Sequence, residues 1–388
     1  ELAQCWPMER RPQLHAAAAR VLRGGRKIEE LDDIRRFAVA RHALGSPEPA
    51  EAVDLALSAG RRALKTFASQ TALKLFSVAA RAARSDTHRR SALLGRAQAL
   101  LQLDRPRKAI RPLSQALLLS TDDLDRAEAL LIRAEAYSIV SELRRTERDL
   151  KEAARLVGEG WPKSRSSMLV CVLREVLFQK LSLRSSTASQ SVPRCEALRC
   201  QVLQVAGRVT WFRRPELGLY FTVRGLRVAL RNGARDEAAR AAAALALMLA
   251  CGFGRHEHAA RKIAEARRLA GPSGSAELLA RLQGYEGMCD FFAGAGVGAV
   301  TKLRSSIRTM TELGEFQDRR LFTAVLGLAK RDLGDIGGFR RMMTELFDSS
   351  VERGGDTQGE AWASFGLAWD ACLHGDLRRA LDYADPAI

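Results

Sequence analysis

Small and large apolar residues recur along this chain at fixed distances, in units of 37 residues near its start and 40 or 41 residues farther on. Small or apolar residues stand twelve and nine positions before a small anchor residue. A large apolar residue follows four positions after the anchor and a small one seven after it. These distances give two successive helices one shared apolar face, so the pattern predicts helix pairs. The best anchors are Ala72, Ala109, Ala259, Ala299 and Ala380.

Glycines mark the predicted turn between the two helices of a pair. In the second half of the chain Gly254, Gly294, Gly334 and Gly375 occupy the same place in successive units. Glycine ends a helix readily because it adopts left-handed backbone conformations at low cost. A single pair cannot bury its apolar stripe, whereas stacked pairs bury a continuous core. The predicted fold is all-α, a superhelical solenoid of stacked antiparallel helix pairs with a period of about 37–41 residues.

The repeat loses its order between residues 158 and 215, where helix breakers and a Ser-rich stretch containing Pro193 interrupt the pattern. The first residue is Glu, and the last stretch stops inside a predicted helix, so we expect both ends to be cuts in a longer protein. The expected organisation is 1–45, N-terminal helices linking to a missing upstream module; 46–182, a first helical-repeat segment; 183–194, a loop or hinge; and 195–388, a second helical-repeat segment.

The stretch FFAGAGVGAV, residues 291–300, has the glycine density of a phosphate-binding loop. It follows no predicted strand and lacks the Lys and Ser/Thr that such a loop requires. Gly294 instead lies forty residues after Gly254 and forty before Gly334, which favours a helix-pair turn. The extra glycines Gly296 and Gly298 predict that this turn is a flexible joint in the stack.

Composition supports the helical prediction and excludes several other classes. Hydrophobic residues make up 47% of the chain and aromatic residues only 6%, so Ala, Leu and Val must form the core. The longest apolar run, Ala241 to Cys251, is too short to cross a bilayer, and we expect no membrane partner. The seven cysteines are scattered and odd in number, which indicates reduced thiols and a cytoplasmic location.

The net charge of +17 raises nucleic acid as a partner. Only ten of the basic residues are Lys, however, and the arginines are spread along nearly every predicted helix. Such an Arg bias also follows from GC-rich coding, and both explanations stay open at this point.

No set of residues indicates catalysis, a cofactor or a metal site. The six histidines form no recognisable ligand set, and carboxylate clusters such as Asp122, Asp123 and Asp125 suit a helix start. The aromatic cluster around Trp211 and Tyr220 could stack on a nucleotide, but packing is the more common use of such residues. We therefore expect a non-catalytic chain.

The repeat resembles the tetratricopeptide repeat in a longer form. The clearest unit is AWASFGLAWDACLHGDLRRALDYA, which has a small residue, a turn glycine, an alanine and an aromatic residue in the family's order. Those residues are Ala368, Gly375, Ala380 and Tyr383. The resemblance implies a solenoid whose concave face binds a protein or peptide.

A narrower resemblance concerns the first eighty residues, which look like the segment after the ATPase module of bacterial signal-transduction ATPases with numerous domains. The matching residues are Arg10, Leu14 and His15, then His42, then Ala59, Gly60 and Ala63. The stretch starting at Arg214 resembles the helical tail of bacterial eukaryotic-like serine/threonine kinases. No phosphate loop or kinase catalytic motif occurs here, so the resemblance implies that such chemistry lies upstream.

These observations favour a non-catalytic interaction or sensor solenoid, the regulatory C-terminal part of a larger bacterial signalling ATPase or serine/threonine kinase. Its partner would be a protein, a peptide or another domain of the same polypeptide. The alternatives are a basic helical-repeat module that binds nucleic acid and the small-molecule effector-binding solenoid of a transcriptional regulator.

Overall fold

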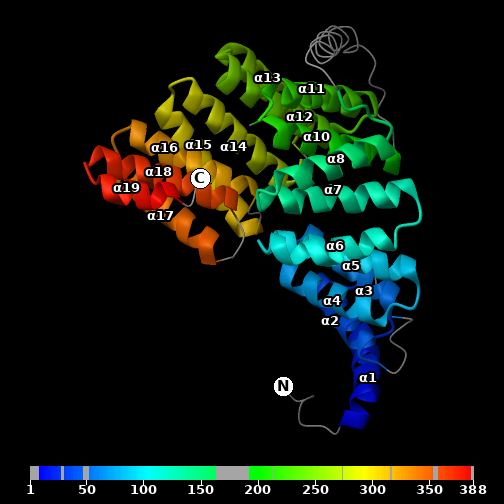
Figure 1. Cartoon of the computed structure of the whole chain (residues 1–388). Helices are drawn as coiled ribbons and strands as arrows, with labels where there is room; N and C mark the ends of the chain where they lie inside the picture. The colour runs from blue at the N-terminus through cyan, green and yellow to red at the C-terminus, as the bar shows by residue number, and fades with distance from the viewer. Residues whose placement is uncertain are drawn as a thin grey trace. The chain divides into compact units, whose positions relative to one another are not determined.

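The computed structural model describes residues 8–27, 30–46, 52–162, 192–211, 213–272, 274–314, 317–352 and 357–385. Within these ranges the regular structure is helical and contains no strand, which confirms the all-α solenoid prediction (Figure 1). The chain divides into two compact units, Glu1–Ala136 and Tyr137–Ile388, here called unit 1 and unit 2. The loop or hinge expected at 183–194 lies outside the described residues except for 192–194, and that domain division stays a prediction.

Unit 1 begins with a short 3-10 helix at Met8–Arg10 and continues as antiparallel α-helices. They are α1 (Arg11–Arg23), α2 (Asp33–Leu44), α3 (Val53–Lys65), α4 (Ser69–Ala82), α5 (Asp86–Gln102), α6 (Pro106–Leu118) and the first part of α7 (Asp123–Ile139).

Unit 2 contains the end of α7 and the following helices. They are α8 (Leu143–Leu156), α10 (Arg194–Trp211), α11 (Pro215–Arg231), α12 (Arg235–Phe253), α13 (His256–Ala270), α14 (Ala276–Phe292), α15 (Gly296–Leu313), α16 (Gln317–Asp332), α17 (Ile336–Glu352), α18 (Thr357–Leu373) and α19 (Leu377–Ala384).

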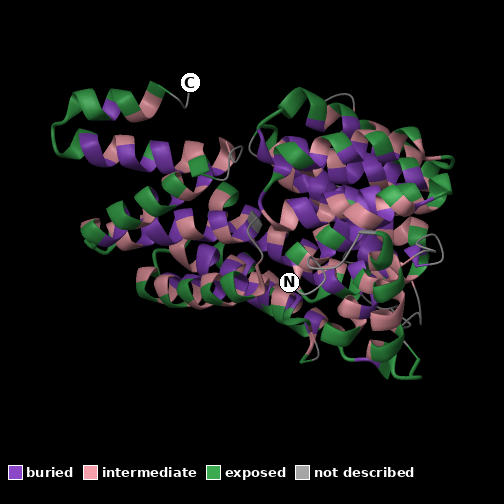
Figure 2. Cartoon of the chain, turned by 90° about the horizontal axis from the view of Figure 1, so that it is seen from below, coloured by how far each residue is buried: buried purple, intermediate pink, exposed green. Residues whose placement is uncertain are grey.

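The residues of the repeat template form the cores of both units. All five best anchors are buried, and Ala72, Ala109, Ala259 and Ala299 are fully inaccessible to solvent. Figure 2 shows the buried positions concentrated on the helix sides that face one another. In unit 2 the first helices of successive pairs, α10, α12, α14, α16 and α18, contact one another. The second helices cover them from outside, so the first helices make the inner layer of the stack.

The four turn glycines all have left-handed backbone conformations, with φ of 61° at Gly254, 79° at Gly294, 84° at Gly334 and 75° at Gly375. Gly296 and Gly298 lie inside the first turn of α15 and not in the connection. A β-carbon on Gly298 would lie 3.2 Å from an oxygen of Asp290, and one on Gly296 would lie 3.1 Å from Leu333. These two glycines therefore allow close packing, and flexibility at this joint remains a prediction.

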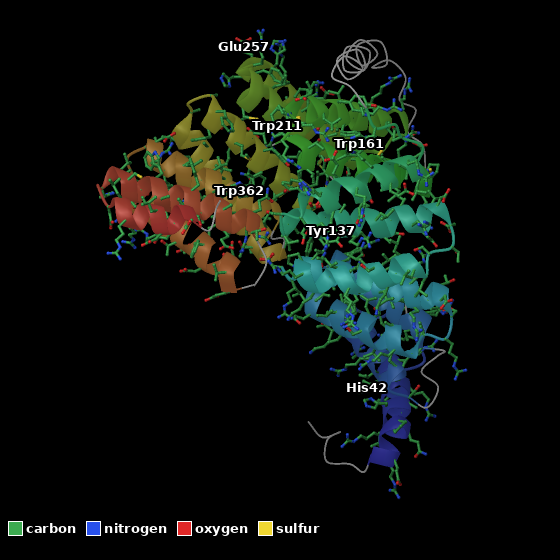
Figure 3. The ribbon with its side chains drawn as sticks, viewed as in Figure 1. His42, Tyr137, Trp161, Trp211, Glu257 and Trp362 are labelled. Carbon is green, nitrogen blue, oxygen red and sulfur yellow. The ribbon has the colours of Figure 1, made fainter. Side chains whose placement is uncertain are left out.

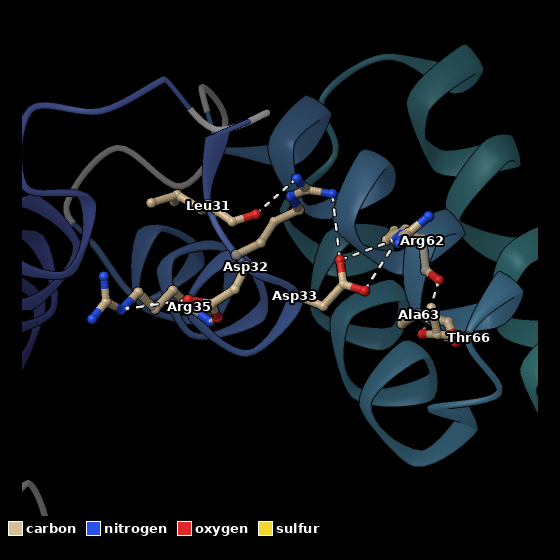
Figure 4. A network of polar contacts seen from close by, with 8 residues as sticks. Leu31, Asp32, Asp33, Arg35, Arg62, Ala63 and Thr66 are labelled. Carbon is tan, nitrogen blue, oxygen red and sulfur yellow. Dashed lines mark hydrogen bonds and ion pairs between the residues drawn. The ribbon is translucent and has the colours of Figure 1, made fainter.

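Acidic residues at helix starts cap the backbone, as the sequence indicates. Asp32 accepts a hydrogen bond from the Arg35 backbone N–H at 2.8 Å (Figure 4). The next residue, Asp33, accepts from Arg62 Nε at 3.1 Å and so ties α2 to α3. At the start of α7 the capping acceptor is Asp122, which lies 2.7 Å from the Asp125 N–H.

Two glycines only three residues apart test the conformational role of the turn glycine. Gly334→Ala is expected to lower the free energy of unfolding by about 1 kcal/mol, because alanine is strained at φ 84°. No atom crowds that position, so the loss reports backbone conformation alone. Gly337 is helical and exposed, and the atom nearest to a β-carbon there would be Arg341 Nη1 at 3.7 Å.

Gly337→Ala is therefore expected to raise the free energy of unfolding by roughly 0.5 kcal/mol. Urea denaturation of the two variants measures both effects. A gain in stability for Gly334→Ala would contradict the assigned turn conformation.

Candidate functional site

A pocket of about 260 Å³ opens on the inner layer of unit 2. It is built by five helices, α7, α8, α10, α16 and α18, and the connections beside them. The lining residues are Ser138, Ser141, Leu143, Arg208, Val209, Arg213, Asp318, Leu321, Gln358 and Trp362. Residues more than 200 positions apart therefore share one site, here called the inner pocket.

A hydrogen-bonded closure brings these distant segments together. The hydroxyl oxygen of Thr357, the first residue of α18, lies 2.8 Å from Ser141 Oγ and 3.2 Å from the Ile139 carbonyl oxygen. Ser141 holds the turn after α7 with a left-handed φ of 57°. The C-terminal repeat of unit 2 is thereby attached to its first helix, and the attachment forms one wall of the pocket.

The lining combines an aromatic anchor with cationic and neutral polar groups. Trp362 lies half-buried on α18 (Figure 3). The apolar side chains of Val209 and Leu321 line the same pocket. Arg213 is exposed at the pocket and pairs with no carboxylate of the described chain. The hydroxyl groups and the Gln358 amide supply donors and acceptors. Such a surface suits an extended peptide with an apolar side chain and a carboxylate.

The only carboxylate of the lining, Asp318, is already neutralised. It is 3% exposed, and its Oδ2 lies 2.9 Å from Arg281 Nη1 on α14. The same bridge occurs one repeat earlier, where Arg240 on α12 lies 2.9 Å from Glu277 on α14. Arg281 also reaches Glu277 at 2.8 Å, so the two bridges join in one network. This network, here called the ion ladder, links the N-terminal turns of three inner helices.

The charges of the ladder shift the titration of its central carboxylate. Burial of Glu277 opposes ionisation, but the guanidinium groups of Arg281 and Arg240 outweigh burial and hold the pKa of Glu277 below its ordinary value. Both acidic residues stand second in their helices, where the helix dipole also favours negative charge.

The inner pocket and the ion ladder were not found from the sequence. The sequence does contain a pattern that indicates the ion ladder. Arg240 and Arg281 are 41 residues apart, and Glu277 and Asp318 have the same spacing. The repeat template contains apolar positions only, so it does not include this polar repeat. The pocket depends on the closure at Thr357, for which no local pattern exists.

The predicted turns and anchors lie away from the pocket lining and serve the packing of the stack. The aromatic cluster that could have stacked on a nucleotide also packs inside the protein. A β-carbon on Gly252 of α12 would lie 2.8 Å from the ring of Trp211. Tyr220 is buried with its ring 5.1 Å from that of Phe221, while Phe212 lies outside the described residues.

Two histidines that carry part of the narrower family resemblance meet in space. Nδ1 of His15 on α1 and Nδ1 of His42 on α2 are 2.8 Å apart. Burial, the charge of Arg41 and the nearby His15 lower the pKa of His42. Among the described residues no group of three or more His, Cys, Asp or Glu side chains could hold a metal ion.

Comparison with known proteins supports the fold assignment. A Rap protein solved in complex with Competence and Sporulation Factor aligns with a TM-score of 0.55 at 12% identity, covering 87% of this chain and 86% of that one. This chain therefore shares the helical solenoid fold of that protein. At this identity the likeness shows the fold alone.

Two further solved structures align more weakly. The apo form of RapI has a TM-score of 0.43 at 11% identity, covering 100% of this chain and 96% of that one. A signal-transduction ATPase with numerous domains and a tetratricopeptide repeat sensor, from Pyrococcus horikoshii, has a TM-score of 0.47 at 12% identity. It covers 98% of this chain, which spans 52% of that protein.

A scan against protein families finds no matching model, and no curated protein matches the chain. No helix in the described ranges is long and apolar enough to span a membrane.

The ion ladder predicts a pH-dependent stability difference. Glu277→Gln is expected to lower the free energy of unfolding at pH 7 by about 2 kcal/mol, because Arg240 loses its charged acceptor and Arg281 keeps only Asp318. The pKa of Glu277 is depressed in the folded protein, so its contribution is complete above the ordinary value of 4.5 and is lost as the pH falls further.

Urea denaturation of both proteins at neutral and acidic pH measures the difference, which should shrink as the pH falls. Glu257→Gln is the matched control, since Glu257 is an exposed residue at the start of α13 (Figure 3). An equal loss in both variants would show that the ladder contributes nothing specific.

Proposed function

We propose that unit 2 is a sensor that binds a short peptide, or an extended segment of a protein, in the inner pocket. The observation that carries the proposal is the lining itself. Trp362, Arg213 and Gln358 face one pocket although they come from different parts of the stack. A half-buried tryptophan beside cations and amide groups is the usual composition of an interaction hot spot.

The chemistry of the pocket indicates the chemistry of the ligand. An apolar or aromatic ligand side chain fits against Trp362 and Leu321, and a carboxylate fits beside Arg213. The backbone of an extended peptide would bond to Gln358 and the serine hydroxyls. The similar Rap protein was solved with Competence and Sporulation Factor, which is consistent with a solenoid of this kind holding a partner.

Binding at this place offers a route to regulation. A ligand in the inner pocket touches residues on both sides of the Thr357 closure. It would therefore change the relative stability of closed and open arrangements of the stack, provided that it binds one more tightly than the other. We propose that an upstream module, a bacterial signalling ATPase or a serine/threonine kinase, responds to this change in the arrangement of the stack. Upstream sequence of the reading frame that encodes neither a phosphate loop nor a kinase domain would contradict this part.

Peptide selection tests the proposed site. The purified chain is used to select binders from a synthetic library of random peptides, and their affinities are measured by fluorescence anisotropy. Selected peptides are expected to be enriched in aromatic and acidic residues. Trp362→Ala should weaken the best peptide about 30-fold, because a buried tryptophan anchor contributes about 2 kcal/mol to binding. Arg213→Glu should weaken acidic peptides further than neutral ones.

Phe365→Ala is the matched control, because Phe365 lies on the same helix, is 68% exposed and does not line the pocket. It should bind the peptide like the parent chain. Selected peptides that bind Trp362→Ala as tightly as the parent chain would place the site elsewhere and overturn the proposal.

A further inference from the structure

Unit 1 contains a second hollow that the sensor proposal does not use. It lies between α4 and α6, with α5 as its floor, and has a volume of about 500 Å³. Leu93, Leu118 and Leu119 provide its apolar surface, and Arg81, Arg89 and Arg96 stand around it. We call it the α4–α6 groove.

The three arginines have no acceptor within the described chain. Arg81 and Arg89 are exposed and make no ion pair there, and Arg96 Nε is buried without a hydrogen-bond partner. Arg90, beside Arg89 on the same helix, differs in having an ion pair, since its Nη1 lies 2.7 Å from Asp125 Oδ1. A guanidinium group without an acceptor is unfavourable when it is buried, which favours a ligand that brings anionic groups to this groove.

The charge of the surrounding sequence is one-sided. Residues 55–121 contain thirteen Lys and Arg residues but only two acidic residues, Asp86 and Asp104. Asp104 is only 2% exposed, so its carboxylate does not compensate the positive charge at the surface. The α4–α6 groove therefore attracts anionic groups and has no carboxylate among its lining residues.

The groove is also strongly apolar at its edge. Leu118, at the end of α6, is 86% exposed although it lies beside the buried Leu93. A phosphate backbone would gain nothing from this leucine edge, and nucleic acid bases stack on aromatic side chains, which the lining lacks. An amphipathic helix can use both the apolar surface and the arginines of the groove. Its apolar side chains pack on the leucines, and its carboxylates pair with the guanidinium groups.

A neighbouring groove repeats the same combination. It has a volume of about 570 Å³ and lies between α2 and α4, with Ile34 83% exposed and Phe37 on its surface. Its cations, Arg41 and Lys74, also pair with no carboxylate of the described residues. Successive grooves on both sides of α4 thus carry an apolar floor and unpaired cations.

We propose that the α4–α6 groove of unit 1 is a docking site for an acidic amphipathic helix of a partner protein. The partner helix lies along α4, its apolar side chains against Leu93 and Leu118 and its carboxylates on Arg81, Arg89 and Arg96. The α4 helix has 14 residues, so a helix of about 21 Å matches its length. This site is separate from the inner pocket, and either proposal stands without the other.

The test uses the full chain and a designed peptide of about 14 residues, matched to the length of α4, with Leu on one helical face and Glu on the other. A scrambled peptide of the same composition removes the amphipathic pattern. We expect the amphipathic peptide to bind and the scrambled one to bind at least tenfold more weakly. Leu118→Asp and the double variant R81E/R89E should each weaken binding about tenfold or more.

The double variant R261E/R268E is the matched control, because it makes the same charge change at two exposed residues of α13 in unit 2. Its affinity should stay within about twofold of the parent chain. A second peptide, with Lys replacing Glu, should bind R81E/R89E better than it binds the parent chain. This exchange of charge distinguishes recognition from a general loss of folding.

Binding of a single-stranded oligonucleotide is measured in parallel. Tight oligonucleotide binding that R81E/R89E abolishes and Leu118→Asp leaves unchanged would assign the groove to nucleic acid and overturn the proposal. Equal affinity for the amphipathic and scrambled peptides, or equal losses in R81E/R89E and R261E/R268E, would overturn it as well.

Discussion

Neighbouring helices in this protein approach one another at distances that only small residues permit. A methyl group at Gly284 of α14 would overlap the ring of Phe322 on α16, and one at Gly60 of α3 would lie 2.7 Å from Phe76 on α4. Each large aromatic ring thus fills the space that a glycine leaves on the next helix. Such contacts limit how closely α14 and α16, and α3 and α4, approach each other, and so they constrain the side chains that these helices carry.

The apolar repeat predicted the fold because it reflects this packing directly. The spacing of small residues around Ala259 and Ala299 is a local pattern that both helices of a pair must share. Turn glycines are similarly local, since a left-handed φ favours glycine wherever it occurs. The stacking of helix pairs could therefore be predicted from this one sequence.

The candidate site could not be predicted from the sequence in the same way. Trp362 and Ser141 line one pocket although they are far apart in the sequence, and the path of a solenoid is the sum of small rotations between many repeats. The sequence around the pocket residues contains no local pattern that reports this accumulated rotation. The two glycines after Gly294 lie inside α15 beside Asp290 and Leu333, a placement that glycine density alone does not indicate. The flexibility expected of that turn stays a prediction.

The two units use the same helix-pair architecture to present different chemistry. In unit 2 Arg240 and Arg281 of the inner layer are paired along the ion ladder, and Asp318 is neutralised there, whereas Arg213 in the same pocket lining pairs with no described carboxylate. In unit 1 the second helices α4 and α6 stand apart, and Arg81 and Arg89 between them have no internal partner. The positive charge of the chain is thus evenly spread in the sequence and unevenly compensated in the structure.

The closure at Thr357 distinguishes unit 2 from an open solenoid. In an open solenoid each repeat contacts only its neighbours, so the terminal repeat frays first and unfolding proceeds from the ends. Here the hydroxyl of Thr357 bonds to groups 216 and 218 residues earlier, which joins one end of the array to the other. A contact of such long range slows folding, because the chain must close a large loop before the contact forms. Once formed, it holds the start of α18 to the end of α7 and the turn after it, so opening of the last repeat must break these hydrogen bonds.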